Sequence, residues 1–165
     1  MVRVAHGLGR GDTPGARQAG FVGLALGAGL LTVLVIFPLT LAEEITLVFI
    51  DADDPGFERV SALVSNIMII AAIFQVFDGA QVIMARCLRA VRDTYFPLWL
   101  GAFGYWVMGI GGGYLLAFPM GWGGQGLWVG LAMGLIVTAI LLTLRFAALT
   151  RRLVQAAKAR PAASA

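Results

Sequence analysis

Four long apolar stretches constrain the fold of this chain more than any other feature. They cover approximately residues 21–42, 60–85, 95–118 and 127–149. Each approaches or exceeds the roughly 20 residues that an α-helix needs to cross about 30 Å of hydrocarbon. Of the 165 residues, 59% are hydrophobic and 13% are charged, whereas soluble domains are about 45–50% apolar and about 25% charged. The sequence therefore predicts an all-α integral membrane protein, a four-span transmembrane helical bundle forming a single membrane domain over residues 1–165.

Charged residues alternate between the two sides of a membrane that such helices would cross. Arginines precede the first stretch and follow the second and the fourth. The connection after the first stretch is instead acidic, with Glu43, Glu44, Asp51, Asp53, Asp54 and Glu58 against Arg59. The positive-inside rule places residues 1–20, the 86–93 loop and the 150–165 tail in the cytoplasm. We expect a multi-pass inner-membrane protein with both termini cytoplasmic. Nucleic acid binding is not expected, because no aromatic platform accompanies the arginines.

Turn-forming residues and helix formers predict where the helices begin and end. Turns are expected around residues 9–14 and at Asp53-Asp54-Pro55-Gly56. Pro97 is expected in the first turn of the third span, where a missing N–H costs least. The tail is expected to fray from Val154 onward.

Glycines spaced four apart predict close contacts between the helices. Such pairs occur at Gly23 and Gly27 and at Gly109 and Gly113, and three glycines form a ladder in the fourth stretch, Gly126, Gly130 and Gly134. Helices in hydrocarbon associate by close packing, which small residues permit. These three faces predict a compact bundle. The glycine run at residues 109–113 also weakens its helix, which favours a kink or an unwound turn there.

Asp78 is the only acidic residue within any of the four apolar stretches. A carboxyl group at membrane depth is costly and usually belongs to an ion or substrate pathway. Gln75 and Gln81 lie three positions to either side and Phe74 lies four before, so these side chains share one broad helix face. Such oxygens could bind a cation or a protonated amine. The alternative is a neutral carboxyl that bonds to a neighbouring helix for packing alone.

The other polar and aromatic residues indicate packing or membrane anchoring more than chemistry. Tyr105 and Trp106 lie mid-span and could line a drug pocket, although plain packing is the simpler interpretation. Trp128 is expected near the membrane interface, and the lone Cys87 is expected to fill space at a helix end. The GxGxxG pattern at residues 121–126 has no preceding strand and predicts a tight turn, not a dinucleotide site. No catalytic motif is present, so the chain is not expected to be an enzyme.

Three segments resemble the bacterial MATE (multidrug and toxic compound extrusion) transporters of the NorM-like branch. Residues 2–12, VRVAHGLGRGD, are similar to the family's RVGxALGAGD loop. Residues 72–81, AIFQVFDGAQ, resemble its AxFQxxDxxQ helix, and residues 88–97, LRAVRDTYFP, resemble its LRGxKDTxxP loop. Order and spacing agree over nearly the whole chain.

This resemblance implies a cation-coupled antiporter that exports organic cations and drugs. MATE transporters have twelve helices in two lobes, and the chain matches helices nine to twelve. The resemblance places a cation-binding acid in the tenth helix, which corresponds to Asp78, binding Na⁺ or H⁺, with Phe74, Gln75 and Gln81 around it. The remaining eight helices, the lipid bilayer and a drug are then the expected partners, and no cofactor is expected apart from the coupling cation.

The sequence also departs from the family pattern at several positions, and two alternatives to a transporter segment are open. The family has glycine where this chain has Ala5, Arg86 and Ala90, and Met1 falls within the first motif. The chain is therefore expected to be a carboxy-terminal fragment. One alternative is a stand-alone, non-transporting membrane scaffold or the remnant of a truncated gene. Another is a lipid-linked sugar flippase of the same superfamily.

Overall fold

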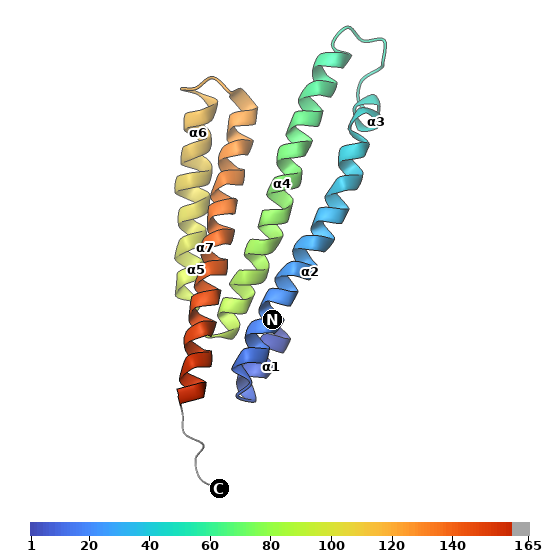
Figure 1. Cartoon of the computed structure of the whole chain (residues 1–165). Helices are drawn as coiled ribbons and strands as arrows, with labels where there is room; N and C mark the ends of the chain where they lie inside the picture. The colour runs from blue at the N-terminus through green and yellow to red at the C-terminus, as the bar shows by residue number, and fades with distance from the viewer. Residues whose placement is uncertain (160–165) are drawn as a thin grey trace.

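The computed structural model describes residues 1–159, and every regular element in that range is helical (Figure 1). In chain order these elements are α1 (Val2–Gly9), α2 (Thr13–Thr40), α3 (Ala42–Leu47), α4 (Phe57–Ala90), α5 (Tyr95–Phe103), the π-helical η1 (Gly104–Gly111), α6 (Gly112–Ala117) and α7 (Gly123–Ala159). Four continuous helical segments are long and apolar enough to cross a membrane: α2, α4, Tyr95–Ala117 and α7. The prediction of an all-α fold with four candidate membrane spans is confirmed.

The long helices lie roughly alongside one another as two pairs, and an extensive contact between α4 and α7 joins the pairs to each other (Figure 1). α2 lies beside α4, and the α5–η1–α6 segment lies beside α7. α1 and the carboxyl end of α7 lie at one end of the molecule, whereas α3 lies at the other. The arginines of the α1 end and the carboxylates of the α3 end are therefore separated by the length of the long helices.

The start of α2 is fixed by a side-chain cap. The Gly15 N–H donates to Asp12 Oδ1 at 2.9 Å, and Pro14 occupies the first turn. Asp12 satisfies one of the backbone donors that a helix start leaves free. Pro38 lies inside the last turns of α2, which ends at Thr40.

A short helix in the acidic connection was not anticipated from the sequence. α3 carries Glu43 and Glu44 in its first turn, where carboxylates interact favourably with the helix dipole. The expected turn follows it, with the Gly56 N–H donating to Asp54 Oδ1 at 2.7 Å. Pro97 lies in the first turn of α5 as expected.

The end of α7 corrects one prediction. The chain does not fray from Val154, because α7 continues without a break to Ala159. The final residues of this helix are Val, Gln, Ala, Ala, Lys and Ala, mostly strong helix formers, and the first proline comes only at position 161. The rest of the predicted tail, residues 160–165, lies outside the described residues. The tight turn predicted at residues 121–126 is only partly right. Gly121, at φ +73°, lies in the connection, whereas α7 begins at Gly123, at φ +57°, so residues 124–126 are helical.

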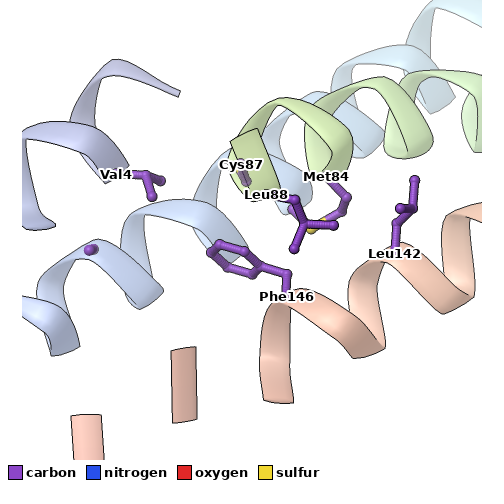
Figure 2. Close-up of a cluster of buried hydrophobic side chains, with 7 residues drawn as sticks. Val4, Met84, Cys87, Leu88, Leu142 and Phe146 are labelled. Carbon is purple, nitrogen blue, oxygen red and sulfur yellow. The ribbon is translucent and has the colours of Figure 1, made fainter. Parts of the chain in front are cut away.

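A single apolar cluster lies at the α1 end of the molecule (Figure 2). It brings together Val4, Ala16, Met84, Cys87, Leu88, Leu142 and Phe146. Cys87 fills space at a helix end, as expected. The buried residues of α2 and α4 all lie here: Ala16 and Gly20 in α2, and Met84, Cys87 and Leu88 in α4. Elsewhere these helices expose large apolar side chains, such as Leu26 at 70% and Phe37 at 68%. Exposed apolar surface on this scale marks a membrane or protein contact.

The glycine ladder of α7 packs directly against the backbone of the third span. A Cβ atom at Gly126 would contact the Ala117 backbone, one at Gly130 would contact Gly113, and one at Gly134 would contact Gly104. Only glycine permits two helix backbones to approach so closely. The predicted faces of α7 and of Gly109 and Gly113 are confirmed, and we call this contact the glycine seam.

The predicted face at Gly23 and Gly27 is half wrong. Nothing lies within 4 Å of a Cβ placed at Gly23, whereas one at Gly27 would contact Ile83. The close approach is made instead by Gly20, which lies against the Phe146 ring. Gly20 and Gly27 are two helical turns apart on one side of α2, while Gly23 is rotated roughly 60° away.

Candidate functional site

Asp78 lies near the middle of α4, and its side chain is half-buried. The Tyr105 hydroxyl, at the start of η1, donates to Asp78 Oδ1 at 3.4 Å. This distance is well beyond the roughly 2.7–2.8 Å of a strong O–H···O bond. The contact therefore orients the carboxylate weakly and leaves it able to accept a second ligand. It also joins α4 of one helix pair to η1 of the other.

The third span widens into π-helical geometry where it meets Asp78. The π-helical segment runs from Gly104 to Gly111 within a continuous helical segment. Its first residue, Gly104, is buried against Thr138 of α7, so the backbone at this point is held by the glycine seam. Tyr105 follows directly. π-Helical turns often occur at functional sites, because they rotate side chains away from their α-helical positions.

Tyr105 is the site residue whose role the sequence left undecided. A mid-span aromatic residue with a hydroxyl group was the available signal, and packing was the simpler interpretation. In the structure, Tyr105 lies near the start of the π-helical segment η1, and its hydroxyl group points toward Asp78. The partner of Tyr105 in α4, Asp78, could not be identified from residue spacing, because the two residues are 27 positions apart and lie on different helices.

Phe74 lies one helical turn before Asp78 and packs against α7. Its ring meets the Trp128 ring edge-on, with centroids 6.0 Å apart and an interplanar angle of 80°. Trp128, expected near the membrane interface, therefore also contacts a residue of the candidate site. This aromatic pair holds α4 and α7 together toward the α3 end of the molecule.

The two glutamines lie in different clefts on either side of Asp78. Gln75 lies in a cleft between α2 and α4, beside Leu31 and Pro38. Gln81 lies in another cleft, between α4 and the α5–η1 segment, and Tyr105 lines the same cleft. Neither glutamine side chain bonds to Asp78 within residues 1–159. The structure thus brings Asp78 and Tyr105 together, whereas the side chains of Gln75 and Gln81 lie in the two clefts on either side of Asp78.

The donor set around Asp78 is small. Within residues 1–159, no three His, Cys, Asp or Glu side chains come close enough to hold a metal ion. A proton needs only the carboxylate, whereas Na⁺ needs several oxygens. In the described part of the chain, Asp78 and Tyr105 are the oxygen-bearing side chains in contact at this point.

A second polar contact fixes the connection between α4 and α5. Arg145 Nε of α7 lies 2.8 Å from Asp93 Oδ2, and the Asp93 side chain is largely buried. The Arg145 guanidinium also lies over the Phe96 ring, 4.8 Å from its centroid. Arg92, with φ +64°, ends the turn just before Asp93. The connection is therefore held against α7 at the end where the apolar cluster lies.

The profile of the MatE family matches residues 1–115, a range that includes both Asp78 and Tyr105. The chain belongs to the MATE family. The resemblance of the three sequence motifs is confirmed, and so is the expectation that the chain is not an enzyme, because MATE proteins are membrane transporters.

Several curated MATE relatives carry the name NorM. The multidrug resistance protein NorM of Burkholderia vietnamiensis is 39% identical over 155 residues, which are 94% of this chain and 34% of that protein. The probable multidrug resistance protein NorM of Brucella suis biovar 1 is 40% identical over 145 residues, 88% of this chain and 31% of the relative. The corresponding protein of Xanthomonas campestris pv. campestris is 41% identical over 152 residues, 92% and 32%. The chain thus spans about a third of the length of the MATE relatives it matches.

Proposed function

We propose that this chain forms the part of a multidrug efflux antiporter that carries a cation-coupling carboxylate, Asp78. The observation that carries the proposal is a lone carboxylate in mid-helix with a single long hydrogen bond, from Tyr105. A carboxylate at membrane depth is costly and by default indicates an ion or substrate pathway. The names of the NorM relatives, which are multidrug resistance proteins, support drugs as the exported substrates.

The proposed chemistry is exchange of Na⁺ or H⁺ at Asp78. Binding of either cation neutralises the carboxylate and weakens the hydrogen bond that the Tyr105 hydroxyl donates to it. The contact between α4 and η1 then weakens, and the two helix pairs become free to shift. A cation gradient coupled to this shift would drive export of an organic cation. Phe74, Gln75 and Gln81 shape the surroundings of Asp78 in this proposal.

The proposed setting is the inner membrane, with both termini in the cytoplasm. The arginine-rich α1 end faces the cytoplasm, and the acidic connection with α3 faces outward, as the positive-inside rule requires. Rocking of one repeat against another needs both repeats. We therefore infer that the remaining helices of a complete transporter supply the other side of the motion.

The test of this function is Asp78→Asn in a complete family transporter that carries this segment. The change removes the charge with little change in volume. Coupled efflux should fall to background in vesicles, while insertion and folding remain as in the parent. Asp53→Asn, in the exposed acidic connection, is the matched control and should transport normally. Efflux at the parent rate from the Asp78 variant would refute the coupling role. Exchanging a Na⁺ gradient for a proton gradient in the same vesicles identifies the ion.

A further inference from the structure

The cleft between α4 and the α5–η1 segment, which Gln81 and Tyr105 line beside Asp78, extends toward the α1 end. It is an open cleft of about 530 Å³. Two arginines, Arg86 and Arg89, lie three positions apart on the last turns of α4 and line it. Within residues 1–159, neither arginine forms an ion pair or a side-chain hydrogen bond. Two positive charges therefore face one cleft with no protein carboxylate to balance them.

The rest of this cleft is mainly apolar. Val82, Leu98 and Trp106 line it, and each of these side chains is exposed, Trp106 at 71%. Gln81 precedes the arginines in α4 by one to two helical turns, and its Oε1 atom is buried without a hydrogen-bond partner among the described residues. The cleft thus has a positively charged end near the carboxyl end of α4 and an apolar wall. The Gln81 amide oxygen, which lacks a hydrogen-bond partner, lies farther inside.

We propose that this cleft binds an anionic phospholipid. The phosphate lies between Arg86 and Arg89, and the first part of an acyl chain lies along Val82, Leu98 and Trp106. Basic pockets between transmembrane helices on the cytoplasmic side suit anionic headgroups.

Charge and shape select this ligand over others. Gln81 and Tyr105 line the inner end of the same cleft. The two arginines would repel an organic cation, so the arginine end of the cleft does not suit the drug proposed for Asp78. A free phosphate would satisfy the arginines but leave the apolar wall uncovered. An anionic lipid is the ligand that matches both ends of the cleft. The proposal needs only a membrane location and stands apart from the antiporter proposal, so either can fail without the other.

Trp106 provides the test, because it lies in the cleft. The chain would be purified with Trp106 as its only tryptophan, through Trp99→Phe, Trp122→Phe and Trp128→Phe. Quenching of its fluorescence would then be measured with traces of brominated phosphatidylglycerol or brominated phosphatidylcholine in neutral detergent micelles. We expect phosphatidylglycerol to quench at an about 25-fold lower fraction of lipid, since each of the two arginines near an anionic headgroup contributes about fivefold. The preference should shrink at high salt.

Matched variants separate the cleft from general surface charge. Arg86→Gln with Arg89→Gln should abolish the preference for phosphatidylglycerol, whereas Arg86→Lys with Arg89→Lys should keep most of it. Arg151→Gln with Arg152→Gln removes the same charge from exposed positions of α7 and should leave the preference intact. Circular dichroism confirms that each variant is helical.

Three results would overturn the proposal. Equal quenching by the two lipids, or no quenching by either, means that the cleft holds no selected lipid. An equal loss in the α4 and α7 variants means that surface charge alone attracts the headgroup. Displacement of the brominated lipid by inorganic phosphate at similar concentration means that the cleft holds a small anion.

Discussion

At the scale of single residues, the proposed cation exchange depends on the contact between Asp78 and Tyr105. The carboxylate has one hydrogen-bond donor at a long distance, and that donor comes from the other helix pair. In the proposed cation exchange, the incoming cation competes with this hydrogen bond for the carboxylate oxygen. A residue whose hydroxyl group competes with the ion can set the concentration at which the ion binds.

Tyr105→Phe is expected to make cation binding tighter. The change removes a hydrogen bond to a charged group, and at this length the bond contributes about 0.5–1 kcal/mol, which corresponds to a roughly two- to fivefold lower half-saturating cation concentration. The measurement is the cation dependence of efflux by a complete transporter carrying this segment. Tyr114→Phe, an exposed tyrosine whose ring contacts Phe118, is the control and should leave the curve in place. A half-saturating concentration that stays the same or rises would contradict the competition.

The sequence was sufficient to find Asp78, because a lone carboxylate in an apolar run is visible without a structure. It was not sufficient to find which side chains meet the carboxylate. Gln75 and Gln81 are each three positions from Asp78, yet 120° separates them around a helix, and they lie in two different clefts. Tyr105 reaches the carboxylate from another helix, and no periodicity along α4 contains that information.

At the scale of helices, the glycine seam brings two helix backbones into direct contact. The backbone of α7 meets the backbone of α5–η1–α6 at Gly126, Gly130 and Gly134. Four-residue glycine spacing predicted this contact correctly. The same spacing failed in α2, because Gly23 faces open space while Gly20 takes the close position. Spacing identifies helices that can pack closely, and the partner surface decides which glycine is used.

Gly130→Ala is expected to destabilise the fold. The added methyl group would overlap the backbone of Gly113, and backbone cannot rotate away as a side chain can. Overpacking of this kind costs about 1–3 kcal/mol. The measurement is the midpoint of unfolding in a mixed-micelle titration, followed by circular dichroism. Gly29→Ala is the matched control, because nothing lies within 4 Å of its Cβ position, and alanine there should be neutral or stabilising. Equal midpoints for the two variants would show that the seam is not tight.

At the scale of the whole molecule, the separation of charge and the exposed apolar surface both indicate helices that span a membrane. The arginine-rich end and the carboxylate-rich end lie at opposite ends of the long helices, and the apolar surface between them has little protein cover. Hydropathy and charge were enough to predict this arrangement from the sequence. The position of the apolar cluster at the α1 end was not predictable from the sequence. Because α2 and α4 are apolar over most of their length, the sequence does not distinguish the residues that contact protein from those that contact lipid.

Cysteine labelling tests the proposed orientation. With Cys87, the only cysteine, replaced by alanine, single cysteines would be placed by Asp53→Cys and by Arg151→Cys. A membrane-impermeant maleimide should label position 53 in intact cells and position 151 only after the membrane is opened. Both positions are exposed, so access depends on the side of the membrane and not on burial. Labelling in the reverse order would invert the orientation.

The confinement of the apolar cluster to the α1 end has a mechanical consequence. The buried side chains of α2 and α4 all lie near that end, whereas the glycine seam runs along much of α7. The α5–η1–α6 segment and α7 are therefore joined backbone to backbone, whereas α4 meets α7 through side chains, in the apolar cluster at the α1 end and in the Phe74–Trp128 pair nearer the α3 end. The Asp78–Tyr105 bond joins α4 to η1 at a position along α4 between these two contacts. In the proposed antiporter, a change at that bond would shift side chains between α4 and the third span and leave the backbone contact of α7 intact.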